Sequence, residues 1–465
     1  MPCVSERASQ ILAAALLTLL VAGTAVGCGG GGGGGGGRAA SARGGGGTAR
    51  GAAPSARASA PVQSVRHVAL IAARVERIRG LRFRRRLVPR RVSAAQARRE
   101  GLADLDRSSP PARLHAQEEL LELLGLLPPG TNLRRLEGAI YGEQVAGFYD
   151  PRRKRLSIVE GAAGSRAAGG ALVDITLAHE LTHALEDQRF GIRDSPSGTD
   201  DAASAYTALV EGSATEVMTR YALRYVGAGQ SLSGALGALA QQAHATKLPP
   251  YLQASLLFPY EAGQRFVEAL YGFSHDWRLV NLALKMNPPR STAQVLHPEK
   301  WLRAEDPVPV RLAVGERLGR GWRRLTAGSL GEWDTTQLLL RAGASAPPAQ
   351  DAATGWRGAR YELWRRVSAS RGSACAAPCR SRDALVVSWT WDTRGDARRF
   401  DEALSSYLAR GLHARRAGKR SWTLPGGAAT VGLGTRATTL AFAPSRHLAT
   451  VLASRAAAPS RRRAQ

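Results

Sequence analysis

The chain has 465 residues and a formal net charge of +27, from 64 Lys and Arg against 37 Asp and Glu. Arg supplies nearly all of this excess and is scattered over the whole length. The basic runs lack the interleaved aromatic residues of nucleic-acid-binding motifs, so no nucleic-acid partner is expected. The charge favours a solvated surface, with attraction to anionic lipid or other anionic envelope polymers as the functional alternative.

Residues 1–27 have the pattern of a secretory signal peptide. Arg7 precedes an apolar run over 11–26, which is shorter than a membrane span and ends in small residues. Cys28 follows a segment that resembles a lipobox, so we expect Cys28 to carry a lipid, with simple cleavage of the signal as the alternative. Residues 28–60 are rich in Gly, Ala and Arg and predict a flexible tether. The expected location is extracytoplasmic, either anchored to the cell membrane as a lipoprotein or secreted.

Residues 61–343 are expected to form the main domain. Residues 81–88 alternate like a strand, Ser93 opens a helix with a capping-box pattern, and a further helix is predicted over 112–127. Residues 143–160 then predict two short strands around a turn. This hairpin either lines a cleft or supports the core, and the sequence leaves both roles open.

The most informative pattern is HExxH, at His179-Glu180-Leu181-Thr182-His183. It lies in a segment, 171–188, that has no Pro or Gly and predicts a helix. Histidines four residues apart point to the same side of a helix and can supply two nitrogen ligands to one zinc ion. The adjacent Glu180 would reach the water that the metal activates. If the histidines were only buried polar residues, burying them without a metal or other partners would be costly.

A second predicted helix, over 203–226, carries the candidate third ligand. Glu211 is followed by Gly212, and small residues there would let this helix pack closely against the HExxH helix. Glu216 lies about one and a half turns further on and would face roughly the opposite way, so Glu211 is the expected ligand. A metzincin site is excluded, because Glu186 and Arg189 occupy the positions of its Gly and third His.

The C-terminal part changes character after about Gly343. Residues 344–458 alternate predicted strands and helices and indicate a small α/β module, followed by a basic tail over 459–465. The module holds no catalytic constellation of its own, so a structural or substrate-presenting role is expected. Cys375 and Cys379 would face an oxidising compartment, and their spacing favours a structural disulfide. The predicted strands cover 361–364, 384–389, 428–433 and 438–442, and the predicted helices cover 396–409 and 446–455.

These motifs resemble those of gluzincin-type zinc metallopeptidases, and more narrowly the metallopeptidase-like envelope lipoproteins of high-GC bacteria. The resemblance spans roughly the middle half of the chain and implies an α+β fold. Its main domain would be mostly helical and zincin-like, with a short β-hairpin before the HExxH helix. The residues that carry the resemblance lie at 145–151, 179–188, 208–212 and 291–298.

The resemblance also implies roles for individual residues. His179, His183 and Glu211 would bind Zn2+, and Glu180 would act as general base in the hydrolysis of a peptide or protein substrate. His297 would donate a hydrogen bond to the oxyanion, with a role at a helix end as the alternative. The rival donors are Tyr149 and Tyr206. Where thermolysin has an Asp this chain has Thr215, so the candidates to orient the histidines are Asp187 and Asp174.

Two other functions remain open at this stage. One is a zinc-binding envelope scaffold without turnover, against which the intact Glu180 argues. The other is a zinc amidase that acts on cell-wall peptides, which the sequence does not separate from a peptidase.

Overall fold

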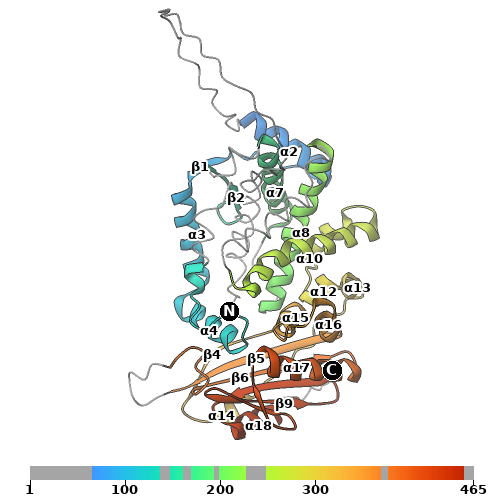
Figure 1. Ribbon diagram of the computed structural model, residues 1–465. Helices are drawn as coiled ribbons and strands as arrows, with labels where there is room; N and C mark the ends of the chain where they lie inside the picture. The colour runs from blue at the N-terminus through green and yellow to red at the C-terminus, as the bar shows by residue number, and fades with distance from the viewer. Residues whose placement is uncertain are drawn as a thin grey trace, which may run out of the picture.

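A helical N-terminal part stands on a C-terminal β-sheet, which gives the chain an α+β architecture (Figure 1). The computed structural model describes residues 65–136, 147–160, 169–192, 198–226, 248–367 and 375–454. The predicted signal peptide, the lipidation site Cys28, the tether and the basic tail lie outside these residues. Within the described ranges, no helix is both long enough and apolar enough to span a membrane.

A three-stranded sheet of order β1-β3-β2 lies beside the HExxH helix. Its strands are β1 (Arg90–Ser93), β2 (Gly147–Asp150) and β3 (Arg155–Glu160). Strand β3 pairs parallel with β1 and antiparallel with β2, which confirms the predicted hairpin before the HExxH helix. The strand predicted over 81–88 is wrong. The backbone N–H groups of Arg84 and Arg85 donate instead to the side chain of Gln188.

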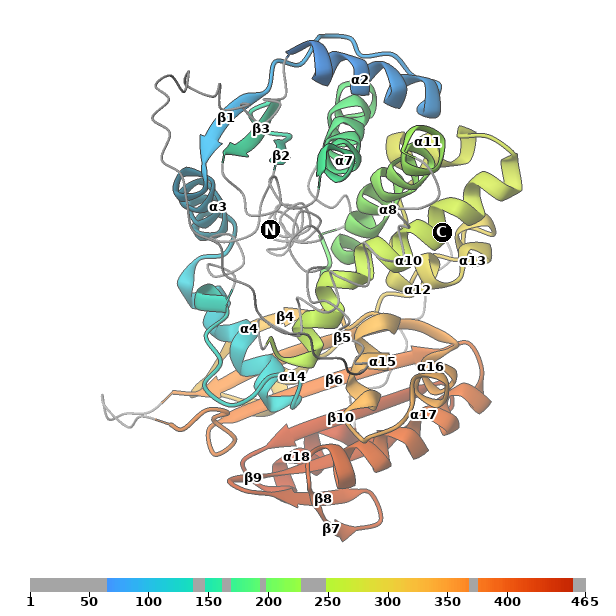
Figure 2. The ribbon, with the colours of Figure 1, turned by 45° about the horizontal axis from the view of Figure 1, so that its top comes forward.

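Four helices enclose the main hydrophobic core. Helix α7 (Gly169–Phe190) carries the HExxH motif and packs against α2 (Val65–Arg79) and α8 (Asp200–Tyr225), and α8 packs along α10 (Pro250–Ser274) (Figure 2). Helices α7 and α8 are also joined by a buried polar contact, in which Ser213 Oγ donates to Glu186 Oε1 at 2.5 Å. Arg79 donates to the same Glu186 oxygen at 2.8 Å, which ties α2 to this pair of helices.

Shorter helices connect the two parts of the molecule. Helix α3 (Ala94–Ser108) begins at Ser93, whose side chain accepts from the N–H of Gln96 and so caps the helix as expected. Helix α4 (Pro111–Leu123) follows and packs its leucines on the C-terminal sheet. The remaining connecting helices are α11 (Arg278–Lys285), α12 (Thr292–Leu296), α13 (Pro298–Leu302), α14 (Val314–Leu318), α15 (Glu332–Leu340) and α16 (Ala346–Ala353).

The C-terminal sheet has seven antiparallel strands in the order β4-β5-β6-β10-β9-β8-β7. One face packs against α4, α15, α16 and α17, and the opposite face packs against α14 and α18. The sheet begins with β4, which lies before the expected boundary at 343/344. The elements are β4 (Trp322–Gly328), β5 (Trp356–Arg366), β6 (Asp383–Trp391), α17 (Arg394–Ser406), η2 (Tyr407–Gly411), β7 (Arg415–Gly418), β8 (Ser421–Leu424), β9 (Gly427–Leu433), β10 (Ala437–Ala443) and α18 (Arg446–Ser454).

The four predicted strands of this part lie within β5, β6, β9 and β10, and its two predicted helices largely coincide with α17 and α18. Strands β4, β7 and β8 were not predicted. Strand β7 has only four residues and a mostly exposed Arg-Arg-Ala-Gly sequence, which lacks the alternation of a half-buried strand. Cys375 and Cys379 form a disulfide with their Cα atoms 5.4 Å apart.

Candidate metal centre

His179, His183 and Glu211 meet where α7 and α8 pack against each other. Their side chains are buried, and one potential ligand atom from each lies within 4.8 Å of the others. The four-residue spacing on α7 directs both imidazoles toward α8, as the sequence predicts. The Glu211 carboxylate approaches them from α8, so the structure brings together all three expected ligands.

The spacing of the three ligand atoms suits a tetrahedral ion. The Nε2 atoms of His179 and His183 are 2.9 Å apart. Oε2 of Glu211 lies 3.2 Å from the His179 nitrogen and 3.4 Å from the His183 nitrogen. Zinc bonds of about 2.0–2.1 Å at a tetrahedral angle place neighbouring ligands about 3.3 Å apart. The three residues therefore fit three corners of a zinc site.

Burial and mutual contacts shift the pKa values of the three candidate ligands. Burial lowers the pKa of His179. Burial also acts to lower the pKa of His183, but the carboxylates of Glu211, Glu180 and Glu186 together outweigh it and raise that pKa to about 9. Burial would raise the pKa of Glu211, yet the charge of His183 and contacts with both imidazoles lower it to about 2. Without a metal, an ionised Glu211 therefore lies beside a protonated His183, and a bound metal ion would take the place of that proton.

Glu180 lies next to the ligands but is held by the hairpin. Its Oε2 accepts a hydrogen bond from the backbone N–H of Tyr149 on β2 at 2.8 Å. Its Oε1 is buried and has no hydrogen-bond partner among the described residues. Burial raises the pKa of Glu180 to about 8. One oxygen of Glu180 is therefore held by the hairpin, and the other has no partner among the described residues.

The expected support of the two histidines is not found among the described residues. The Nδ1 atoms of His179 and His183 are buried and have no hydrogen-bond partner there. Asp174 contacts His67 at 2.6 Å, and Asp187 binds Tyr149 and Lys154, so neither orients a ligand histidine. The hydroxyl of Thr215 is likewise without a partner in the described part of the chain.

Tyr260 is the residue of this site that the sequence did not reveal. It is fully buried on α10, with its ring centroid 6.1 Å from that of His179. Its hydroxyl interacts with the Glu211 carboxylate but makes no hydrogen bond of standard geometry among the described residues. Burial and the charges of Glu211 and Glu180 raise the pKa of Tyr260 well above its usual value, so the phenol stays protonated. Tyr260 follows Phe258 and Pro259 in an apolar stretch of the sequence, where an aromatic residue is typical of a hydrophobic core.

A close crossing of α8 and α10 brings Tyr260 to the site. A Cβ atom added to Gly212 would lie 2.1 Å from the backbone carbon of Gly263. The small residue after Glu211 therefore admits α10, whereas the sequence suggested that it admits the HExxH helix. Tyr260 lies three residues before Gly263 and so shares a face of α10 with it.

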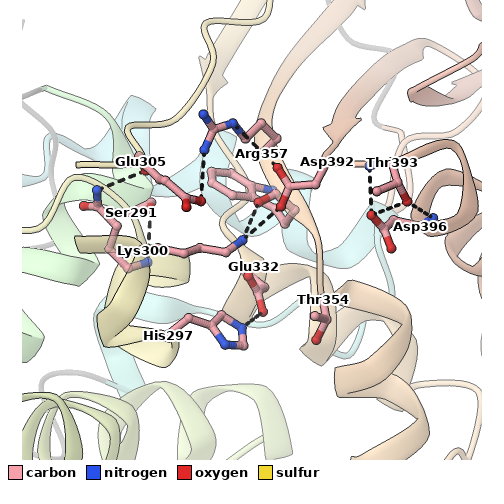
Figure 3. Close-up of polar contacts among 12 residues, drawn as sticks. Ser291, His297, Lys300, Glu305, Glu332, Thr354, Arg357, Asp392, Thr393 and Asp396 are labelled. Atoms are coloured by element: carbon pink, nitrogen blue, oxygen red, sulfur yellow. Dashed lines mark hydrogen bonds and ion pairs between the residues drawn. The ribbon is translucent and has the colours of Figure 1, made fainter. Parts of the chain in front are cut away.

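His297 lies in a different polar cluster. Its Nε2 is 2.6 Å from Glu332 Oε1 on α15, beside Lys300, Asp392 and Arg357 (Figure 3). Glu332 follows Gly331, which packs on Asp201 at the start of α8. Asp201 and Glu211 are ten residues apart, or about 15 Å along the helix. The structure thus pairs His297 with Glu332 and separates it from the expected oxyanion site.

Glu216 also stays apart from the ligands, as the helical geometry predicts. It accepts hydrogen bonds from Arg220 at 2.7 Å and from Gln264 at 3.1 Å.

The two tyrosines that were rival candidates to donate to the oxyanion are Tyr149 and Tyr206. Tyr149 uses its hydroxyl to bind Asp187 at 2.7 Å, and Tyr206 is buried on α8.

Comparison with known proteins identifies only the C-terminal part. A family model described as a domain of unknown function (DUF8575) matches residues 316–452. This span covers the seven-stranded sheet and excludes the candidate metal centre. No curated protein and no solved structure matches the chain.

Proposed function

We propose that this protein is a zinc-dependent metallopeptidase with a zincin-like helical domain. The observation that carries the proposal is the set of three buried ligand atoms 2.9–3.4 Å apart, with a carboxylic acid adjacent to them on the same helix. His179, His183 and Glu211 would hold the ion. When bound, zinc acidifies water and polarises the carbonyl of the peptide bond that is cleaved.

Glu180 is the general base in this proposal. Its Oε1 takes a proton from the attacking water and later returns it to the leaving amine, while Oε2 stays on the N–H of Tyr149. A base works best when its pKa lies near the working pH, and burial moves the pKa of Glu180 in that direction.

In this proposal Tyr260 takes the role that the resemblance assigned to His297. A neutral phenol buried beside the ligands can donate a hydrogen bond to the oxyanion as the carbonyl becomes tetrahedral. Its hydroxyl already interacts with the Glu211 carboxylate, so in this proposal the phenol would exchange that contact for the oxyanion. His297 is already paired with Glu332 and has no free Nε2 for this task.

The location and substrate complete the proposal. A lipoprotein anchored through Cys28 would act on peptides or proteins in the cell envelope, at the end of the predicted tether. The experiment is a digest of a peptide library by purified protein, with and without a chelator, and in parallel a digest of muropeptides. Chelator-sensitive cleavage of the library supports the peptidase. Cleavage of muropeptides alone would replace it with a wall amidase, and no cleavage of either, with zinc bound, would favour a scaffold.

A further inference from the structure

Asp187 is a buried carboxylate whose described hydrogen-bond partners all lie outside the metal site. Its side chain is inaccessible to solvent and accepts from the Tyr149 hydroxyl at 2.7 Å and from Lys154 Nζ at 2.7 Å. The backbone N–H of Ile192 adds a third contact at 2.9 Å. Burying a carboxylate is costly without such partners, so this residue depends on the hairpin for its stability.

Asp187 and Glu180 lie on the same face of α7, because they are seven residues, or two turns, apart. Tyr149 spans the distance between them. Its backbone N–H donates to Glu180 and its hydroxyl donates to Asp187. The backbone and the side chain of Tyr149 therefore both donate hydrogen bonds to the helix that carries the HExxH motif.

Lys154 completes the attachment from the turn between β2 and β3. Its φ is 52°, in the left-handed region that residues other than Gly rarely adopt. From this position the ammonium group reaches both oxygens of Asp187 at 2.7 Å. Strained backbone of this kind persists only where the surrounding structure holds it, and it is concentrated at functional sites.

We propose that Asp187 is a positioning residue for the general base. By holding the Tyr149 hydroxyl, it fixes the strand so that the Tyr149 N–H orients the Glu180 carboxylate with one oxygen free. We call Tyr149, Lys154 and Asp187 the hairpin clamp. The catalytic part of this inference rests on the proposed function, whereas the clamp itself is tested without any activity.

The test compares Asp187→Asn and Tyr149→Phe with wild type. Asp174→Asn is the matched control, because Asp174 also lies on α7 but contacts His67 rather than the hairpin. The first measurement is amide exchange at Tyr149, by mass spectrometry with site-resolving fragmentation. The second is bound zinc, and the third is kcat and KM on the best library peptide.

Both clamp variants should exchange the Tyr149 amide at least about tenfold faster, while amides of the β1–β3 ladder and the zinc content stay unchanged. With activity present, kcat should fall roughly 10–100-fold with KM within about threefold, as when a partner that orients a site residue is lost. Asp174→Asn should match wild type. Unchanged exchange at Tyr149 in Tyr149→Phe overturns the inference, even if Asp187→Asn fails to fold.

Loss of zinc in both clamp variants also overturns it, since the clamp would then hold the ligands and not the base. A wild type that cleaves no peptide, yet shows the exchange effect, overturns the proposed peptidase and leaves the clamp standing. Faster exchange of the residue 149 amide with unchanged kcat would show that the contact exists but would refute a positioning role for Asp187.

Discussion

The metal centre and the C-terminal sheet both bury polar side chains, but the two regions differ in whether those side chains have hydrogen-bond partners. Around the metal centre, several buried polar atoms have no hydrogen-bond partner among the described residues. They are Nδ1 of His179, Nδ1 of His183 and Oε1 of Glu180. Such atoms cost free energy in a folded protein unless a ligand or ion completes them.

Along the central strands of the sheet, buried polar side chains are paired with one another. Trp389 Nε1 donates to Thr335 Oγ1 at 3.0 Å, and Ser388 lies 3.0 Å from Thr439 across β6 and β10. Asp383 accepts two hydrogen bonds from Arg365 at 2.6 Å. These contacts satisfy the hydrogen-bonding groups of the side chains that make them.

The difference separates a site from a scaffold. Pairing within the sheet stabilises the fold, whereas at the metal centre Oε1 of Glu180 is left for the reaction that we propose. Substitutions at the metal centre should therefore lower turnover, whereas substitutions in the sheet should lower the stability of the fold.

The largest effect is expected for Glu180→Gln. The amide keeps the shape and the Tyr149 contact but accepts no proton, so turnover should fall by at least about 100-fold. Bound zinc and thermal stability should match wild type. Steady-state kinetics on a library peptide provide the measurement, and activity above about one percent of wild type would contradict the role of Glu180.

Asp201 lies near the start of α8 and accepts hydrogen bonds from the N–H and hydroxyl of Thr292 on α12. Burial raises the pKa of Asp201 from 3.8 to about 7. The folded protein thus holds this proton to higher pH than the unfolded chain, and its contribution to stability is lost as pH rises from about 4 to about 7. The loss is on the order of 4 kcal/mol.

Asp201→Asn keeps an oxygen acceptor for Thr292 and removes the titration. Urea unfolding of both proteins between pH 4 and pH 8 measures the difference. The stability of Asp201→Asn relative to wild type should grow as the pH rises. A constant difference over this range would show that Asp201 is ionised in the folded protein throughout.

Gly212→Ala tests the crossing that delivers Tyr260. The new Cβ would lie 2.1 Å from Gly263 backbone, so α10 must move, at a cost of about 3 kcal/mol. Activity should fall more than zinc content, because the ligands lie on α7 and α8 alone. Chemical unfolding, zinc analysis and kcat provide the measurements. A variant as stable as wild type would contradict this account.

Trp389→Phe should give the smallest effect and the opposite pattern. It removes the N–H bonded to Thr335 and part of a buried ring, at a cost of about 2 kcal/mol. Zinc content and kcat at a permissive temperature should be unchanged. A loss of turnover without a loss of stability would show that the sheet takes part in the chemistry.

Local spacing explains how much of the site the sequence could predict. His179 and His183 lie four residues apart on one helix, and Glu211 is recognised by the Gly that follows it. All three ligands could therefore be predicted from residues near them in the sequence. Tyr260 depends on a contact between Gly212 and Gly263, 51 positions apart, that no local pattern records.

The fold shows the same division. The hairpin and the long helices follow from periodicity, whereas the segment at 81–88 pairs with side chains of α7 instead of a strand. His297 was placed by resemblance alone, and its partner Glu332 comes from a helix that the sequence did not connect with it.

The most direct test of the central claim is the zinc content of purified protein, measured by elemental analysis for wild type, Glu211→Ala and Glu216→Ala. The two glutamates lie on the same helix, but only Glu211 faces the histidines. We predict one zinc per chain in wild type and in Glu216→Ala, and none in Glu211→Ala. A wild type without zinc after loading, or a Glu211→Ala variant that keeps it, would contradict the assignment of the metal centre.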